Sequence, residues 1–210
     1  VYAFFGGNCE SLGASKPMAV LKLNGQTLVM PKATAGMGYV KTAKTGEKMK
    51  TLSIEKQTDG TSWGAVYAQF VQPTADVADA AEGMSVVREV LKNGKRIATD
   101  GETLAVGDRI TVRIVINADR DYDFVQLADR RAACLEPLGQ LSGYRDGCYC
   151  EPKDNATNYY FDRLSKGKHV VETEYYVDRA GTYQTGTCTV QCAYSPEFGA
   201  RTKAVALSVE

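Results

Sequence analysis

The chain has 210 residues, with 25 basic and 25 acidic side chains and a formal net charge of zero. This balance gives no electrostatic reason to expect a nucleic-acid or anionic-membrane partner, and no apolar run approaches the roughly 18 residues that a membrane span needs. The apolar fraction of 44% is typical of packed cores, in one large or two ordinary domains.

The first third of the chain predicts a succession of β-strands. Residues 1–12 are apolar and then glycine-rich, as at the end of a helix, and from residue 16 the apolar period becomes two. Asn24-Gly25 is a strong hairpin signal. Five strands without an intervening helix indicate an antiparallel all-β region. They are predicted over residues 18–23, 27–30, 38–42, 49–55 and 62–70.

A change of composition marks the predicted boundary between two regions. Residues 72–83 are acidic, alanine-rich and poor in large apolar side chains, with room for one short helical turn. We therefore predict a first β domain over residues 15–76, a linker over 77–84 and a second β domain over 85–210.

The second region repeats the alternating pattern over a longer stretch. Asn93-Gly94 predicts another hairpin, and Gly181-Thr182-Tyr183 predicts a turn. Seven or eight strands in about 125 residues are typical of an immunoglobulin-like sandwich. The predicted strands cover residues 85–91, 95–97, 109–116, 122–127, 157–162, 167–177, 187–194 and 204–209.

The six cysteines favour disulfides in an oxidising compartment over a zinc site. Their spacings are not those of zinc pairs, and the chain has one histidine, so no metal site is predicted. Residues two or four apart on a strand share a face, which suits bridges between neighbouring strands. Cys9 is the expected free thiol. The expected disulfide cysteines, with their pairing open, are Cys134, Cys148, Cys150, Cys188 and Cys192.

The stretch 119–147 contains the sequence closest to a known reactive motif. A Cys-x-Glu-Gln tetrapeptide marks the internal thioester of complement-like and macroglobulin proteins, in which the thiol joins the acyl carbon of the glutamine. Here Cys134-Leu135-Glu136 is followed by Pro137, which has no side-chain acyl group, so no thioester can form. A structural Cys134 is the favoured interpretation over a nucleophile that uses His169 as its base.

Other polar motifs are better explained by structure than by chemistry. Asp119, Asp121 and Asp123 alternate as on the wet face of a strand and lack the glycine and glutamate of a calcium loop. Residues 129–131, Asp-Arg-Arg, predict a local ion-pair cluster at a strand end. Gly36-Met37-Gly38 lacks the rest of a dinucleotide fingerprint, so no cofactor is predicted.

Two surface features complete the candidate sites. Asn155-Ala156-Thr157 fits a glycosylation sequon, which matters only in a eukaryotic secretory host. In each doublet, Tyr159-Tyr160 and Tyr175-Tyr176, alternation predicts one ring in the core and one outside.

The same residues resemble a known family. Segments 119–129, 134–137, 141–144, 157–167 and 186–198 are similar to the C-terminal part of bacterial alpha-2-macroglobulin-like proteins, particularly those of Bacteroidetes, and segment 186–198 is the most specific. In the first region, residues 38–39 and 62–67 also fit the family. Cys148 and Cys150 depart from its pattern.

This resemblance implies a layout and a function. Residues 1–14 are expected to be the remnant of a helical thioester-type domain, 15–76 a CUB-like half-domain that exposes an edge or apolar face, and 85–210 a macroglobulin-like sandwich. Such proteins are periplasmic, surface-exposed or secreted, can be lipid-anchored, and trap proteases by conformational collapse. The expected partners of the fragment are the preceding domains of the parent chain, and proteases through the full-length protein.

We therefore expect a non-enzymatic, all-β structure of two antiparallel sandwich domains, the second immunoglobulin-like, after a short helical remnant. Its role in the parent would be structural and conformational. The alternative class is a secreted adhesin or carbohydrate-binding β-sandwich that uses the outer tyrosines and the 119–123 face. A weaker alternative is an enzyme that uses Cys134 and His169.

Overall fold

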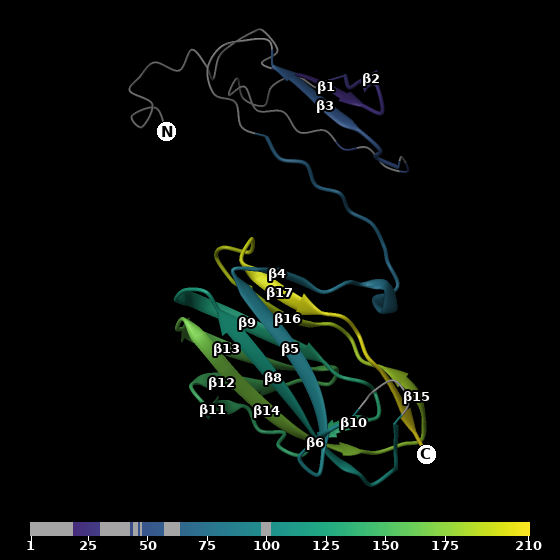
Figure 1. The fold of residues 1–210 in the computed structure, drawn as a ribbon, viewed down its shortest axis with the longest axis vertical. Coiled ribbons are helices and arrows are strands. Elements are labelled where there is room, and N and C mark those ends of the chain that lie inside the picture. Colours follow the sequence, from purple (N-terminus) through teal and green to yellow (C-terminus); the bar gives the residue numbers. More distant parts are fainter. Residues whose placement is uncertain (1–18, 30–42, 44–45, 47, 57–63, 98–101) are drawn as a thin grey trace. The chain divides into compact units, whose positions relative to one another are not determined.

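The computed structural model describes residues 19–29, 43, 46, 48–56, 64–97 and 102–210. The chain divides into two compact units, Val1–Gln69 and Phe70–Glu210, and the described residues are almost all β (Figure 1). No helix in these ranges is long and apolar enough to cross a membrane. The expected helical remnant over 1–14, the strand over 38–42 and Cys9 lie outside the described residues.

The first unit contains a three-stranded antiparallel sheet in the order β2-β1-β3. Its strands are β1 (Ala19–Leu23), β2 (Gln26–Thr27) and β3 (Leu52–Lys56). Asn24 and Gly25 connect β1 to β2 with φ angles of 50° and 83°, as the Asn-Gly hairpin predicts. The Asn24 side chain also accepts a hydrogen bond from the backbone N–H of Lys50 at 2.8 Å, which ties the hairpin to the chain before β3.

The predicted strand over residues 62–70 is wrong for its described part. Residues 64–73 form no strand, and the side chains of Tyr67 and Phe70 are 89% and 74% exposed. Alternation alone predicted this strand, but a strand also needs a hydrogen-bonded neighbour. The segment is followed by a single 3-10 turn, η2 (Thr74–Asp76), within the stretch expected to hold a short helical turn.

The second unit holds the remaining strands, and the long alternating ones lie where the sequence predicts them. These strands are β4 (Ala80–Glu82), β5 (Met84–Lys92), β6 (Lys95–Arg96), β7 (Thr103–Leu104), β8 (Arg109–Ala118), β9 (Tyr122–Arg130), β10 (Leu135–Pro137), β11 (Gly143–Arg145), β12 (Cys148–Pro152), β13 (Ala156–Leu164), β14 (Gly167–Val177), β15 (Gly181–Gln184), β16 (Cys188–Cys192), β17 (Gly199–Thr202) and β18 (Ala206–Val209).

One hydrogen-bonded path runs through most of these strands and folds into a sandwich. Its order is β10-β14-β8-β5-β4-β17-β16-β9-β13-β12-β11, with β6 paired to β5. The part from β10 to β5 forms one layer, and the part from β4 to β11 forms the other (Figure 1). Side chains of β13 and β14 meet between the layers, since Thr157 and Tyr175 share a 2.8 Å hydrogen bond. This architecture confirms the predicted immunoglobulin-like sandwich.

The path turns from one layer to the other at Gly83. β4 and β5 are joined there by one residue pair, Glu82 with Met84, and Gly83 has a φ of 70°. A Cβ at Gly83 would lie 2.2 Å from the hydroxyl of Tyr122 and 2.9 Å from the ring of Phe198. Glycine is therefore required by both backbone conformation and space.

This corner corrects two sequence predictions. The expected linker over residues 77–84 contains β4, whose residues Ala80–Glu82 pair with β17, and it ends at the first residue of β5. The Ala-rich composition indicated a linker, but alanine also fits a short strand whose small side chains are exposed. The boundary between the two units lies earlier, between Gln69 and Phe70.

A second, three-stranded sheet in the order β15-β18-β7 packs against the same core. Leu104, Leu207 and Val209 of this sheet are buried. The sequence predicted a purely antiparallel region, but β18 and β7 are parallel. The turn expected at residues 181–183 is the beginning of strand β15.

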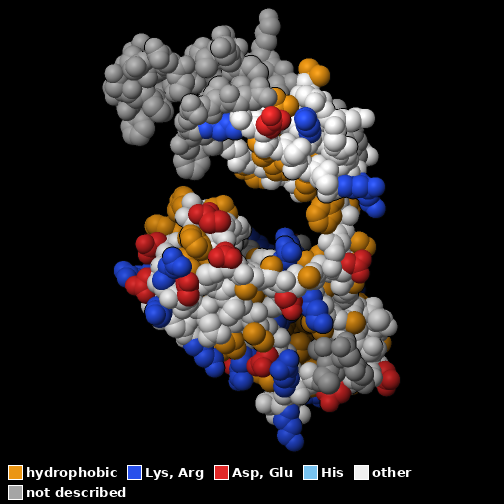
Figure 2. All heavy atoms as spheres, turned by 45° about the horizontal axis from the view of Figure 1, so that its top comes forward, with side chains coloured by type: hydrophobic (Ala, Val, Ile, Leu, Met, Phe, Trp, Pro, Cys, Tyr) orange, Lys and Arg blue, Asp and Glu red, His pale blue; other side chains and the backbone are white. Residues whose placement is uncertain are grey.

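The core is filled by alternate residues of the long strands. In β8 the inward side chains are 0–5% exposed, and each layer supplies β-branched and aromatic side chains. On the surface drawn in Figure 2, basic and acidic side chains are interspersed, in keeping with the zero net charge. The inward residues of β8 are Ile110, Val112, Ile114, Ile116 and Ala118.

Candidate functional site

The stretch 119–147 folds as β9, a connection through β10, and the edge strand β11. At the start of β9, Phe124 has a φ of 56°, and both Tyr122 and Val125 point inward, three residues apart. Strict alternation would separate inward residues by two, so the alternation shifts by one residue at Phe124, while the register with β13 is the same on both sides of it. The Phe124 ring lies outside, 5.3 Å from the ring of Tyr194 in an edge-to-face pair.

Two of the three alternating aspartates, Asp119 and Asp121, are paired with arginines. The Asp119 carboxylate accepts hydrogen bonds from Arg120 at 2.9 Å and from the Tyr122 hydroxyl at 2.7 Å, which lowers its pKa to about 2. Asp121 pairs with Arg163 at 2.6 Å. Among the described residues, no three of His, Cys, Asp and Glu are grouped so that they could hold a metal ion.

The prediction of a local ion-pair cluster at residues 129–131 is wrong. Asp129 is buried and pairs at 2.8 Å with Arg88 of β5, which reaches it from the opposite layer. Arg131 instead donates to the backbone carbonyls of Leu135 and Asp154, at 2.9 and 2.7 Å. A local cluster is what sequence neighbours suggest, but alternation turns Asp129 and Arg130 to opposite faces of β9.

The Arg88–Asp129 ion pair is the most buried charged site among the described residues. The two side chains are each 3% exposed. Arg88 also donates to the hydroxyl of Thr185 at 2.7 Å and to the carbonyl of Lys203 at 3.1 Å. Its Nε lacks a partner in the structure. Burial raises the pKa of Asp129, while the guanidinium of Arg88 lowers it. This arrangement joins strands from three parts of the sequence and resembles a structural clamp.

The predicted disulfides are absent from the structure. The five cysteines of the described ranges are buried free thiols. The strand registers explain this, since no cysteine faces another: Cys150 lies opposite Tyr159, Cys188 opposite Asp129 and Cys192 opposite Val125. Residues that share the face of one strand need a partner on the next strand, and here the partners have other side chains. The buried thiols are Cys134, Cys148, Cys150, Cys188 and Cys192.

Burial also makes two of these thiols, Cys134 and Cys148, poor nucleophiles. It raises the pKa of the Cys134 thiol, and it raises the pKa of Cys148 to about 11. Cys150 lies 2.6 Å from the Arg145 guanidinium but is itself fully buried. The thiolate needed for nucleophilic chemistry is therefore disfavoured at Cys134 and Cys148.

Cys134 and His169 are not brought together. The carbonyl of Cys134 accepts from the backbone N–H of Asp178, just after the end of β14, whereas His169 lies near its beginning. Nine residues of strand separate Asp178 from His169, or about 30 Å. The His169 ring contacts the carbonyl of Ser165 at 2.7 Å. These positions give no Cys–His dyad.

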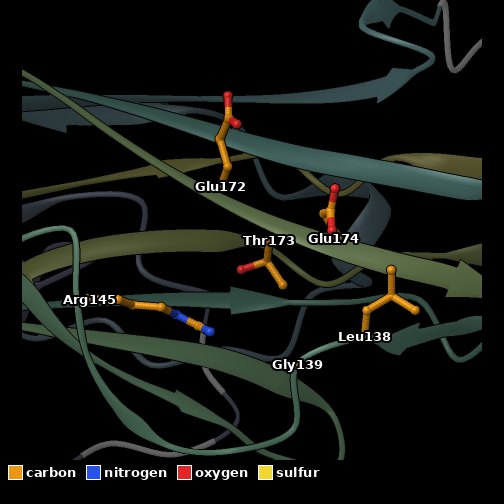
Figure 3. Close-up of a pocket in the computed structure, with 6 residues that line it drawn as sticks. All are labelled: Leu138, Gly139, Arg145, Glu172, Thr173 and Glu174. Carbon is orange, nitrogen blue, oxygen red and sulfur yellow. The ribbon is translucent and has the colours of Figure 1, made fainter.

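A hollow lies beside this stretch, between β11, β14 and the residues that follow β10. It has a volume of about 220 Å³. In Figure 3 the Arg145 guanidinium points into it towards Thr173, while the Glu172 carboxylate points away. The Thr173 hydroxyl is already hydrogen-bonded to the Tyr159 hydroxyl, and the Arg145 guanidinium is hydrogen-bonded to the Cys150 sulfur. The hollow thus contains no pair of groups arranged for acid–base chemistry. Its lining residues are Leu138, Gly139, Arg145, Glu172, Thr173 and Glu174.

The sequon and the tyrosine doublets have clear positions. Asn155 is exposed, whereas the Thr157 side chain is buried and hydrogen-bonded to Tyr175. Tyr159 and Tyr175 are 2% and 0% exposed, and Tyr160 and Tyr176 are 37% and 40% exposed. The predicted division of each doublet between core and surface is confirmed.

The sequence analysis missed the buried clamp and the outer tyrosine row described below. A signal for the clamp existed in Arg88, a charged residue between Val86 and Val90 on the inward face of β5. Its partner could not be found in the same way, because pairing across two layers depends on the order of the strands.

Comparison with known proteins connects this architecture to one family. Residues 83–197 match the family model described as the bacterial alpha-2-macroglobulin MG10 domain. This matched region begins at the corner glycine and includes the strands from β5 to β16. A comparison with curated proteins gave no match.

Solved structures of bacterial alpha-2-macroglobulins share the fold. Salmonella alpha-2-macroglobulin reacted with methylamine is 20% identical with a TM-score of 0.56, over 64% of this chain and 10% of that one. The trypsin-activated protein from Escherichia coli is 17% identical with a TM-score of 0.56, over 64% and 11%. Its native conformation is 19% identical with a TM-score of 0.58, over 66% and 10%.

The chain therefore spans about a tenth of the length of the alpha-2-macroglobulins that it matches. At these identities the likeness concerns the fold of the sandwich, whereas the family match covers more than half of the sequence itself. The chain belongs to the bacterial alpha-2-macroglobulin MG10 domain family.

Proposed function

We propose that this chain is a non-catalytic part of the C-terminal region of an alpha-2-macroglobulin-like protease trap of the Bacteroidetes type. The observation that carries this proposal is the family match over residues 83–197. One structural relative was solved in a trypsin-activated form, which links that protein to activation by a protease. In the parent, the sandwich would change position as a rigid body when the trap is activated.

The proposed layout places residues 1–14 at the end of a helical thioester-type domain and 15–76 in a CUB-like half-domain. Of the described residues in the first unit, Leu23 alone is a buried hydrophobic. Val29 and Ile54 are 91% and 60% exposed. A small sheet with so little described core supports a domain that is completed by other parts of the parent chain.

The absence of a catalytic role is supported by the positions of Cys134 and His169, at opposite ends of β14. Pro137 after the Cys-x-Glu sequence excludes an acyl partner for the thiol. The proposed partners are the preceding domains of the parent and, through the complete protein, proteases. The proposed location is extracytoplasmic, in the periplasm, at the cell surface or secreted, with a lipid anchor on the parent.

The test uses the complete parent protein and a variant that lacks residues 70–210. Trypsin treatment should change the native-gel mobility of the parent, and the truncated protein should fail to make the same change. The parent should also protect a large protein substrate from trypsin, and the truncated form should protect it less. Equal protection by both forms would contradict a role of this region in the trap.

A further inference from the structure

Three tyrosines lie side by side on the outer face of the layer that contains β11, β12 and β13. The strand registers place Tyr144 opposite Tyr149, and Tyr149 opposite Tyr160. The ring centroids of the first pair are 5.3 Å apart and those of the second 6.4 Å. Cys148 and Cys150 flank Tyr149 on β12 and are buried. Tyr149 and the two rings in register with it therefore belong to the outer face.

The row continues across the sheet with uncharged amide side chains. Tyr160 lies opposite Gln126 of β9, and Gln126 lies opposite Gln191 of β16. We call Tyr144, Tyr149, Tyr160, Gln126 and Gln191 the tyrosine–glutamine row. It crosses five adjacent strands and is about 19 Å long. None of its five side chains carries a charge.

The neighbouring positions of the outer face are also mainly neutral. Asn158 and Thr189, each on the same face two residues away from a row member, present an amide and a hydroxyl. The carboxylate of Glu151 accepts from the Tyr160 hydroxyl at 3.2 Å and is paired with Lys153 at 2.7 Å. The row therefore lies in a polar surface with aromatic rings at one end, and its charged neighbours are of both signs, Asp162 on β13 and Arg201 on β17.

The fold does not need these rings for its core. Tyr144 is 74% exposed and Tyr160 is 37% exposed, while the inward Tyr159 fills the core on the same strand. Tyrosine side chains have few rotatable bonds, and each ring here is held against its neighbour on a paired strand. A ligand that stacks on them would thus lose little additional side-chain entropy.

We propose that the tyrosine–glutamine row binds an extended, uncharged polysaccharide. The apolar C–H faces of sugar rings fit the faces of exposed tyrosines, and sugar hydroxyls fit amide and phenol groups that both donate and accept hydrogen bonds. A row across five strands suits a chain ligand better than a compact one. This activity goes beyond the proposed role in a protease trap.

The chemistry of the row disfavours other occupants. A nucleic acid would require basic side chains along its phosphates, and the row has none. An apolar helix or a second apolar sheet would require a continuous apolar patch, whereas the phenol and amide groups interrupt this surface.

The experiment is affinity electrophoresis of the full chain in native gels that contain soluble dextran, mannan, laminarin or xylan, with alginate as the acidic counterpart. We expect at least one neutral polysaccharide to retard the protein and alginate not to do so. Tyr149→Ala, which removes the middle ring, should weaken the apparent affinity about tenfold. Tyr144→Ala should weaken it severalfold and, because this ring is largely exposed, should leave the fold intact.

The matched control is Tyr176→Ala on β14 of the other layer, where the ring is 40% exposed. It should bind as the unchanged protein does. Circular dichroism of each variant checks that the strands remain folded. The proposal is overturned if no neutral polysaccharide retards the protein, or if Tyr144→Ala and Tyr149→Ala bind normally. It is also overturned if sedimentation shows that the row instead joins two copies of the chain, with a dimer that Tyr144→Ala dissociates.

Discussion

Arg88 and Asp129 join the two layers of the sandwich through a single pair of side chains. Taking both charges out of water costs several kcal/mol, which their attraction and hydrogen bonds only partly offset. Arg88 has an additional cost in its unpartnered Nε. The pair is therefore better understood as a device that fixes how the layers meet than as a large source of stability.

Replacing Arg88 alone should be severely destabilising. Arg88→Met leaves the Asp129 carboxylate buried without its partner, and we expect a loss of about 3–5 kcal/mol in the free energy of unfolding. The measurement is urea denaturation followed by circular dichroism. The double variant Arg88→Met, Asp129→Leu removes both charges and should recover most of the loss. A single variant within about 1 kcal/mol of the unchanged protein would show that the clamp is dispensable.

Asp108 should contribute to stability in a pH-dependent way. Hydrogen bonds from the Ala105 backbone at 2.8 Å and from Lys92 at 2.5 Å lower its pKa below the ordinary value of 3.8. The unfolded chain therefore binds a proton more readily, so this contribution is present above about pH 4 and is lost as the pH falls through the lowered pKa.

Asp108→Asn should thus be less stable than the unchanged protein at pH 7, and the difference should shrink towards about pH 2. Denaturation curves at several pH values measure it. Lys92→Met is the companion variant: it removes the cation but keeps the bond from Ala105, so it should reproduce only part of the effect. A difference that is constant with pH would contradict the role given to the carboxylate.

At the scale of residues, alternation in the sequence predicts which tyrosine of each doublet is buried, and Tyr159 and Tyr175 confirm it. It does not predict the partner of Asp129, because Arg88 comes from a strand 41 residues earlier and from the other layer. The prediction of disulfide bonds failed for the same reason. Whether two cysteines meet depends on the register between strands, which the spacing of 148 and 150 does not contain.

Gly83 is the element-scale feature on which the continuity of the sandwich depends. Gly83→Ala would place a Cβ against Tyr122 and Phe198 and force a side chain into a left-handed conformation. We expect a loss of about 2–4 kcal/mol, the sum of backbone strain and overpacking. Thermal and urea unfolding of the full chain measure it.

The matched control is Gly94→Ala in the β5–β6 hairpin. Gly94 has a similar φ of 73°, but a Cβ there would meet no atom within 4 Å. This variant should show the backbone cost alone, about 1 kcal/mol. Equal losses for the two variants would mean that the packing around Gly83 adds nothing.

Long elements with strict alternation were predictable, and short ones were not. β8 and β14 lie where their alternating apolar residues predict them. β4, β10 and β11 have three residues each, too few for a period, and they form because a longer strand offers them a free edge. The predicted strand over 62–70 failed in the opposite way, since its described residues alternate without a neighbour to pair with.

At the scale of the whole molecule, the division into two units predicts one preferred site of cleavage. Residues 64–73 are exposed and form no strand, and Tyr67 and Phe70 are the largest exposed side chains there. Limited chymotrypsin digestion should cut after one of these residues first. Mass spectrometry should then find a resistant fragment that begins near residue 71 and contains the sandwich.

The boundary predicted from composition, residues 77–84, gives the contrasting outcome. With a linker there, a protease of broad specificity such as proteinase K would cut first between residues 77 and 84 and release a fragment without β4. A stable fragment that lacks residues 80–82 would therefore contradict the structural division, because β4 pairs with β17 in the sandwich. Composition can locate the boundary between two units only to within several residues, since it carries no information on which residues form hydrogen bonds.

The pairing of β4 with β17 has a mechanical consequence. Three registered residue pairs, Ala80–Glu82 with Gly199–Arg201, are the first strand pairing that the chain makes on entering the second unit. A pull on the preceding chain would reach this ladder before Gly83 and the core. Since the bonds of an antiparallel ladder run across the strands, tension along β4 loads them in shear rather than one at a time. The short strand would then bear tension from the preceding chain before the core of the sandwich does, while the rest of a larger protein moves.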